Sequence, residues 1–291
     1  IGVMWFDGEW TDGWTEEKGQ ELYDHLRKIQ PDLIINDRVG RGRQITRAER
    51  RENVDDTREF AGDFGTPEQE IGAFNVEDPW ETCMTLGRQW AWKPDDDLKS
   101  LSQCLRTLVS VVCGGGNLLF NVGPMPDGRI EPRQVKRLRQ MGAWLKKYGD
   151  GVYGTRGGPF KPGKWGASTC KDGKIYLFIM NWQSDDRVVL PAINSKIISY
   201  RTFGRGQLSL KQNKKNIEIH LPAADQDKIA TVVELTVNGS AFDINPVDVP
   251  DSNPTALKMK GEATGLKNKI KALEREVDKL KKAKGGGKKA A

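Results

Sequence analysis

Residues 101–123, LSQCLRTLVSVVCGGGNLLFNVG, place a helical pattern directly before a strand. Apolar residues recur at helical spacing from about Asp97 to Cys113, and three glycines at 114–116 end the pattern. Asn117–Val122 is a continuous apolar run of the kind found in sheets that are covered on both faces. The stretch therefore predicts helices that alternate with the strands of a parallel sheet.

The same alternation extends to both sides of this stretch. Upstream, the sequence predicts a strand at Ile1–Asp7, a helix at Glu16–Ile29, and strands at Asp32–Asn36 and Trp80–Thr85. Downstream, Pro132–Tyr148 predicts a helix with proline in its first turn. The polar segment Gly40–Asp63 is interpreted as a long loop with one helical turn. This pattern favours a parallel α/β barrel or an open sheet up to residue 150.

The character of the chain changes after residue 150. Short runs with β-branched content or alternating polarity follow, separated by Gly, Pro, Asn and Asp: Trp165–Cys170, Lys174–Trp182, Arg187–Leu190, Lys196–Phe203, Asn216–Leu221 and Ala230–Val237. They predict a small antiparallel β-sandwich. The predicted domains are an α/β part at 1–150, a β-sandwich domain at 151–245, and a linker with a Lys-rich tail at 246–291.

The basic character of the chain comes from this tail. From Lys258 onward there are 12 Lys and Arg against 4 Asp and Glu, so the tail carries +8, although the whole chain carries only +6. The remainder has a net charge of −2, which argues against a nucleic-acid-binding face. Leu266, Ile270, Leu273, Val277 and Leu280 form a short heptad seam. A solvated tail, a zipper that forms a homo-oligomer, and a contact with an anionic surface all remain open.

Composition excludes two further classes of protein. The longest apolar run, Leu105–Cys113, is far below the roughly 20 residues of a membrane span, so no span is predicted. The 4 cysteines form no CxxC pair and only 2 histidines are present, so no zinc site is predicted.

Three acid-bearing segments end or follow strands: WFDGEW (5–10), TPEQE (66–70) and WE (80–81), which contain Asp7, Glu68 and Glu81. Glycoside hydrolysis needs two carboxyl groups in an aromatic-lined pocket, one ionised and one protonated. Plainer interpretations remain: an acid after a strand often caps a turn, the tryptophans can be core residues, and Glu81 can pair with an arginine such as Arg88. Spacing alone leaves a glycosidase, a sugar-binding protein and a generic α/β protein open.

Five motifs in a fixed order narrow this choice. They are VMWFDGEW (3–10), LIINDR (33–38), TPE (66–68), WETCMT (80–85) and GGNLLFNVGPMPDG (115–128). As an ordered set they resemble the second half of an alpha-L-fucosidase of glycoside hydrolase family 29. The resemblance covers residues 1–150. It implies a partial (β/α)8-type barrel, then an antiparallel β-sandwich domain, with the charged helical tail outside the family pattern.

The resemblance also implies a retaining mechanism in which Asp7 is the nucleophile. Glu68 matches the acid/base, with Glu70 and Glu81 as alternatives. Arg38 is expected to keep Asp7 ionised. Glu68 has no arginine close to it in the sequence, so partial burial is expected to favour its protonated form. Retention requires the two carboxyl groups to lie about 5–5.5 Å apart.

Trp5, Arg38 and Trp90 match residues that bind the sugar in the family, and the implied partner is a fucosylated glycan or glycoconjugate. The chemistry needs no metal and no other cofactor. A non-catalytic carbohydrate-binding protein on the same scaffold is the alternative. The family also binds fucose through histidines on earlier strands, for which His25 and His220 do not stand in. We therefore expect the chain to be an incomplete fragment that is inactive alone. A secreted, periplasmic or lysosome-like compartment is expected from the family.

Overall fold

The computed structural model describes residues 1–40, 61–184 and 186–250. Most of the predicted loop at Gly40–Asp63 and the whole heptad seam of the tail lie outside these residues. By their contacts, residues 1–249 form one compact unit. Among the described helices, none combines the length and the apolar character needed to cross a bilayer.

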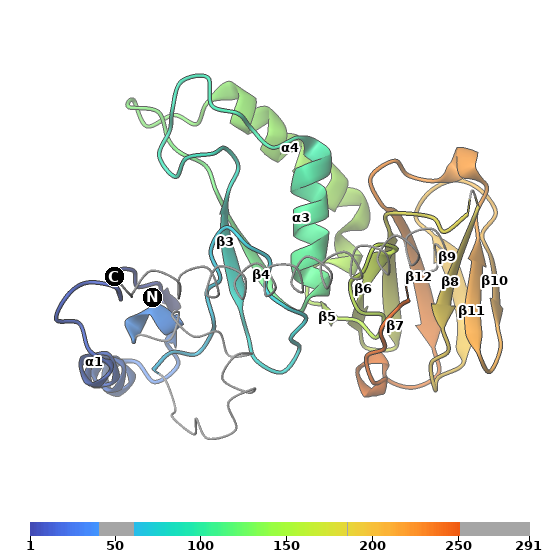
Figure 1. Ribbon diagram of the computed structural model, residues 1–291, viewed down its shortest axis with the longest axis horizontal. Coiled ribbons are helices and arrows are strands. Elements are labelled where there is room, and N and C mark those ends of the chain that lie inside the picture. Colours follow the sequence, from blue (N-terminus) through green and yellow to red (C-terminus); the bar gives the residue numbers. More distant parts are fainter. Residues whose placement is uncertain (41–60, 185, 251–291) are drawn as a thin grey trace, which may run out of the picture. The chain divides into compact units, whose positions relative to one another are not determined.

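The first part of the chain alternates strands and helices (Figure 1). Its elements are β1 (Val3–Met4), α1 (Glu16–Ile29), β2 (Ile34–Ile35), the 3-10 helix η1 (Asp37–Val39), β3 (Glu81–Thr85), α3 (Leu101–Cys113), β4 (Asn117–Asn121) and α4 (Pro132–Tyr148). β1 pairs with β2 and β3 pairs with β4, both in parallel. Single parallel bridges join Asn36 to Phe64 and Gly65 to Trp80, so the segment at 64–65 links the two pairs. The predicted α/β character with parallel pairing is confirmed.

Local capping explains where the helices begin. α1 and α4 have the predicted bounds, with the Thr15 hydroxyl capping the first and Pro132 opening the second. The predicted start of α3 at Asp97 is wrong, because the helix begins only at Leu101. Ser100 and Gln103 form a reciprocal capping box there, in which each side chain bonds to the other's backbone N–H. This box fixes the start more strongly than the preceding aspartates do.

The second part of the chain is antiparallel. Its strands are β5 (Arg156–Gly157), β6 (Gly166–Lys171), β7 (Lys174–Ile179), β8 (Arg187–Pro191), β9 (Ile197–Thr202), β10 (Ser209–Gln212), β11 (Asn216–His220) and β12 (Thr231–Val237). They form a five-stranded sheet in the order β5-β6-β7-β12-β9 and a three-stranded sheet in the order β10-β11-β8. The sequence missed β5 and β10. Both are short strands at the edges of their sheets, with little apolar patterning to mark them.

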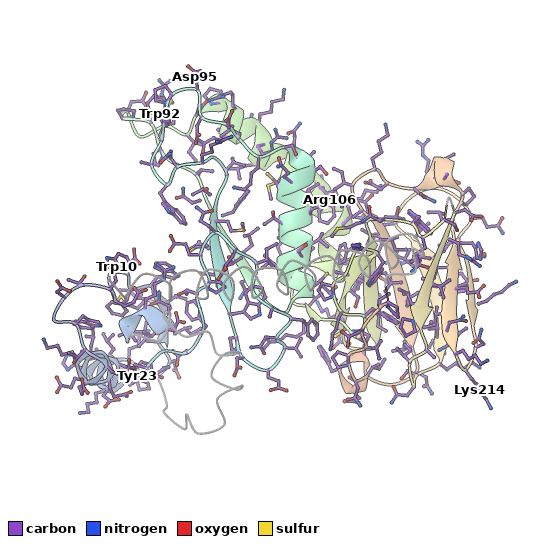
Figure 2. All side chains as sticks on the ribbon, viewed as in Figure 1. Trp10, Tyr23, Trp92, Asp95, Arg106 and Lys214 are labelled. Atoms are coloured by element: carbon purple, nitrogen blue, oxygen red, sulfur yellow. The ribbon has the colours of Figure 1, made fainter. Side chains whose placement is uncertain are left out.

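Two hydrophobic clusters hold these elements together. One lies between the two antiparallel sheets and includes Ile175, Leu190, Ile217 and Leu235. The other joins α3 and α4 to the five-stranded sheet. Arg106 of α3, labelled in Figure 2, adds a hydrogen bond from its Nη2 to the Met180 carbonyl at 3.4 Å. Residue 150 therefore separates two kinds of sheet, but one core continues across it.

Gly116 ends the glycine run between α3 and β4 and is required by Trp80, which is buried beside it. A Cβ at Gly116 would lie 2.5 Å from three ring atoms of Trp80. Gly116→Ala is therefore expected to destabilise the fold by about 1–3 kcal/mol through overpacking, measured by urea unfolding. Gly142→Ala is the matched control, because a Cβ there meets nothing within 4 Å. It lies inside α4 and should stabilise the chain slightly. Equal effects of the two changes would contradict this account.

Candidate active site

The guanidinium of Arg38 brings the two principal predicted acids together. Its Nη1 donates to Oδ1 of Asp7 at 2.5 Å, and its Nη2 donates to Oε2 of Glu68 at 2.9 Å. The Arg38 side chain is only 1% exposed, whereas that of Asp7 is 54% exposed. The expected pairing of Asp7 with Arg38 is thus present. Glu68 has no arginine close to it in the sequence, but the fold brings Arg38 to it across 30 residues.

Three further residues fix the orientation of Arg38. Its Nε donates to Oγ1 of Thr66 at 3.0 Å, and that hydroxyl donates to Oδ1 of Asp37 at 2.6 Å. Its Nη2 also lies 3.4 Å from Sγ of Cys83. Burial works to lower the pKa of Arg38, but the hydrogen bonds with Asp7 and Glu68 outweigh it and raise the pKa. The guanidinium is therefore a fixed positive charge at the centre of what we call the acid cluster: Asp7, Glu68, Arg38 and the residues that hold these three in place.

Trp5 lies against the same guanidinium. The Arg38 Cζ atom is 4.3 Å from the centroid of the Trp5 ring. One face of this indole is therefore covered by a cation rather than open to a sugar. The Trp5 Nε1 is buried and faces the carboxyl group of Glu81, which it stabilises in the ionised form.

Backbone pairing with β3 holds Glu68 in place. The Cys83 N–H donates to the Pro67 carbonyl at 3.1 Å, and the Gln69 N–H donates to the Cys83 carbonyl at 2.9 Å. Gln69 has a φ of 56°, which turns the chain away after Glu68. Glu70, the first alternative acid, is consequently exposed, and its backbone carbonyl accepts a hydrogen bond from Thr82 at 2.5 Å. The turn thus separates Glu68 from Glu70.

Glu81, the second alternative, begins β3 and is half-buried. Burial raises the pKa of Glu81, and the nearby Trp5 indole offsets part of the rise. The suggested pairing of Glu81 with Arg88 is wrong, since Arg88 pairs with Asp97 at 3.0 Å. Glu81 therefore lies near Trp5, in surroundings that favour its protonated form.

The raised pKa of Glu81 makes a prediction about stability. The folded chain binds this proton more tightly than the unfolded chain, so stability falls as the pH rises above the ordinary value of 4.5. Glu81→Gln is expected to have little effect on the melting temperature near pH 4 and to raise it relative to wild type at pH 7. Glu21→Gln, on the exposed surface of α1, controls for the change in net charge. If the difference in melting temperature between Glu81→Gln and wild type shrinks as the pH rises, the raised pKa of Glu81 is contradicted.

The structure does not join every predicted residue to this cluster. Trp90 lies on the loop after β3, is 43% exposed, and accepts a hydrogen bond at its carbonyl from Asn121 at 2.9 Å. No described hydrogen bond, ion pair or ring contact connects Trp90 to Asp7 or Glu68. His25 is exposed on α1, and His220 lies on β11, 3.7 Å from Asp186. Neither histidine belongs to the acid cluster.

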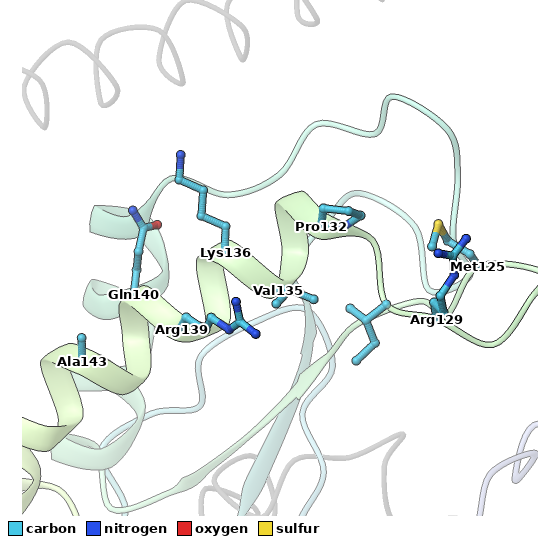
Figure 3. Close-up of a pocket in the computed structure, with 9 residues that line it drawn as sticks. Met125, Arg129, Pro132, Val135, Lys136, Arg139, Gln140 and Ala143 are labelled. Carbon is cyan, nitrogen blue, oxygen red and sulfur yellow. The ribbon is translucent and has the colours of Figure 1, made fainter.

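A cavity of about 590 Å³ lies elsewhere, along α4 and the loop before it (Figure 3). Its lining is apolar with a basic rim: Met125, Arg129, Ile130, Pro132, Val135, Lys136, Arg139, Gln140 and Ala143. None of the predicted site residues lines it. The candidate site is therefore the acid cluster at the strand ends, and this cavity is a separate feature of the surface.

Two residues of the cluster had no role in the sequence analysis. Thr66 links Arg38 to Asp37, and Asn36 is fully buried with its side chain bonded to the backbone of Phe6. Both stand inside quoted motifs, at LIINDR and TPE. The sequence did offer a signal for Asn36, because it is a polar residue at the end of an apolar strand. A buried amide at such a position must find hydrogen-bond partners.

Comparison with known proteins agrees with the motifs. The family described as Alpha-L-fucosidase matches residues 2–150, which is more than half of the chain. The alpha-L-fucosidase of Branchiostoma floridae is 27% identical over 244 residues, covering 78% of this chain and 51% of that protein. The human plasma alpha-L-fucosidase is 32% identical over 155 residues, covering 48% of this chain and 33% of that protein.

Solved structures give the same result. The alpha-L-fucosidase isoenzyme 1 of Paenibacillus thiaminolyticus has a TM-score of 0.69 and 30% identity, and the match covers 82% of this chain and 58% of that one. The Thermotoga maritima alpha-fucosidase has a TM-score of 0.61 and 30% identity, covering 81% and 52%. The chain thus spans about half the length of several of the relatives it matches. From the family match, the motifs and the shared fold together, we conclude that this chain belongs to the alpha-L-fucosidase family.

Proposed function

We propose that these residues form the nucleophile and acid/base half of a retaining alpha-L-fucosidase site. The substrate would be an alpha-L-fucosyl glycan or glycoconjugate. Asp7 is the nucleophile, Glu68 is the acid/base, and Trp5, Arg38 and Trp90 belong to the surroundings of the sugar. Glu81 is the second choice for the acid/base. Its support is the raised pKa, whereas Glu68 is supported by the TPE motif and by its placement with Asp7 on one guanidinium.

One observation carries this proposal: Asp7 and Glu68 bind the two terminal nitrogens of one guanidinium. Because the guanidinium is a small planar fork, the bound oxygens lie at most about 8 Å apart. Retaining glycosidases hold their two carboxyl groups about 5–5.5 Å apart and inverting ones about 6.5–9.5 Å apart, so the bound admits either class and retention is proposed from the family membership. This bound supports a site in which both acids reach one glycosidic bond. Within the described residues, the second carboxylate oxygen of Asp7 has no protein partner, which leaves it available to attack.

The proposed reaction takes place in two steps. An oxygen of Asp7 attacks the anomeric carbon of fucose while the bond to the aglycone oxygen breaks, and Glu68 gives its proton to that oxygen. Water then attacks the anomeric carbon of the fucosyl ester, passes a proton to Glu68 and releases Asp7. Arg38 holds both acids throughout. The two inversions together retain the anomeric configuration.

We further propose that the parallel strands β1 to β4 are part of a (β/α)8-type barrel. Support comes from the parallel pairing and from relatives of which the chain covers about half. Val3, Ile34 and Leu119 are about half exposed on these strands, which is unusual for parallel strands. Further strands would cover them. We use the term complete catalytic unit for the 291 residues together with the barrel strands that relatives carry outside the matched half.

The test is an assay with an aryl alpha-L-fucoside and with an alpha-fucosylated oligosaccharide. The complete catalytic unit is expected to release alpha-L-fucose first, before the sugar mutarotates, and the 291 residues alone are expected to release none. First release of the beta anomer would rule out retention. Fucose binding by the complete unit without any turnover would instead favour the carbohydrate-binding alternative.

A further inference from the structure

The side chain of Asn36 forms both backbone hydrogen bonds of Phe6. Its Oδ1 accepts from the Phe6 N–H at 2.8 Å, and its Nδ2 donates to the Phe6 carbonyl at 2.9 Å. Asn36 is 0% exposed, so water cannot replace these bonds without opening the fold. A buried amide that satisfies the two polar groups of one residue acts as a substitute for a strand backbone.

The Asn36 side chain takes the place of strand backbone at the point where the backbone ladder between β1 and β2 ends. The backbone pairing runs through Val3 with Ile34 and Met4 with Ile35, and the Asn36 N–H still reaches the Met4 carbonyl at 3.3 Å. The chain then turns into η1, whose first residue is Asp37. The Asn36 side chain does not cap η1, although asparagine commonly caps such turns. It bonds instead to Phe6, two residues beyond the end of β1, and so continues the pairing past the backbone ladder.

The clamped residue carries the proposed nucleophile. Phe6 directly precedes Asp7, and Asn36 lies two residues before Arg38, which binds Asp7. Asn36 also forms a parallel bridge with Phe64, close to the segment that bears Glu68. Among the described residues, the side chain of Asp7 forms its hydrogen bond with Arg38. The backbone on its N-terminal side is therefore a second restraint on its position, beside the turn on its C-terminal side in which Thr11 donates to the Gly8 carbonyl.

We propose that Asn36 is a positioning residue for Asp7, fixing the strand end so that the carboxylate meets both Arg38 and the anomeric carbon. The kinetic part of this proposal rests on the proposed function, whereas the structural part does not. An error of about 1 Å in placing a reacting group lowers a rate by about 100-fold. Loss of the clamp should therefore lower kcat on that scale, with little change in KM.

The chain offers a matched control. Gln183 makes the same pair of bonds to Val189 in the β-domain, donating from Nε2 to its carbonyl at 3.1 Å and accepting from its N–H at 2.8 Å. Asn36→Leu and Gln183→Met each replace a clamping amide by an apolar side chain of similar size. Both variants lose two hydrogen bonds, but only the first loses them next to Asp7.

The first experiment uses the 291-residue chain and NMR. In Asn36→Leu, the Phe6 amide should exchange with solvent at least about 10-fold faster, and the Arg38 side-chain signals should lose their protection. The Ile35 amide, which donates to Asp63 at 2.7 Å, is the internal reference. In Gln183→Met, Val189 should exchange faster while Phe6 and Arg38 remain unchanged. Unchanged Phe6 and Arg38 signals in a folded Asn36→Leu chain would overturn the proposal.

The second experiment uses the complete catalytic unit and the aryl fucoside. Asn36→Leu should lower kcat by about 100-fold with KM within about threefold, while Gln183→Met should keep both constants. If Asn36→Leu does not fold, Asn36→Asp decides, since it keeps the acceptor for Phe6 and should lose less. Normal kcat in the Asn36 variants, in a unit that Asp7→Asn inactivates, would overturn the positioning role alone. Activity in Asp7→Asn would overturn the proposed function and leave the NMR result to decide the clamp.

Discussion

Asp7→Asn is expected to lower the hydrolysis of an aryl alpha-L-fucoside by the complete catalytic unit at least about 1,000-fold. An amide oxygen is too weak a nucleophile to form the fucosyl ester, so the first step fails. The fold should survive, because the Asn side-chain oxygen still accepts the hydrogen bond that Arg38 Nη1 gives to Asp7. Initial rates and melting temperatures of the two proteins, measured side by side, separate chemistry from folding.

Asp7→Gly with added azide provides a sharper control. Azide can enter the space left by the carboxylate and attack the anomeric carbon from the same side, which gives a fucosyl azide of inverted configuration. Recovery of this product would identify Asp7 by the stereochemistry that it normally sets. Residual wild-type activity in Asp7→Asn, or a fucosyl azide that retains the alpha configuration, would remove Asp7 from the nucleophile role.

Arg38→Met is expected to destabilise the 291-residue chain by about 3 kcal/mol, measured by urea unfolding. The change removes the buried cation that Asp7 and Glu68 share and leaves two carboxylates facing each other. Water partly relieves this loss, since the Asp7 side chain is half exposed. We therefore expect the lower end of the range for a broken buried pair. In the complete catalytic unit, the same change should abolish measurable hydrolysis.

Two further substitutions define what Arg38 contributes. Arg38→Lys keeps the charge, but one ammonium cannot serve Asp7, Glu68 and Thr66 in the way three guanidinium nitrogens do. It should recover part of the stability and little of the activity. Arg201→Met is the matched control in the β-domain, because Arg201 is over half exposed and its partner Glu234 keeps Lys174 at 3.1 Å. A cost of about 1 kcal/mol or less is expected there. Equal losses in the two Met variants would refute a special role for Arg38.

The local elements could be predicted because their signals lie within a few residues. α1 and α4 have apolar stripes with recognisable ends, and the β-rich runs after residue 150 alternate clearly. The start of α3 was missed because the Ser100–Gln103 capping box outweighs the acidic run before it. β10 was missed because an edge strand has a partner on one side only and needs little apolar character.

The candidate site was predictable as a set of motifs, but not as an arrangement. The acids Asp7 and Glu68 were identified from residues that stand next to them in the chain. The contact of Asp7 with Arg38 was expected from the family resemblance, but the contact of Glu68 with the same arginine was not, since 30 residues separate them in the chain. The clamp of Asn36 on Phe6 spans 30 residues in the same way. Sequence spacing says little about distance once parallel strands bring remote segments together.

By itself, the sequence determined the alternation of helices and strands, the switch to antiparallel pairing after residue 150, and the ordered motifs of the family. These depend on local periodicity, on capping and on residue identity, all of which can be read along the chain. Only the tertiary structure decided that one buried guanidinium holds both acids, that Glu81 is half-buried near Trp5, and that Asn36 completes the ladder beside Asp7. Burial and hydrogen-bond partners depend on which segments meet in space, and that meeting is set by packing rather than by order along the chain.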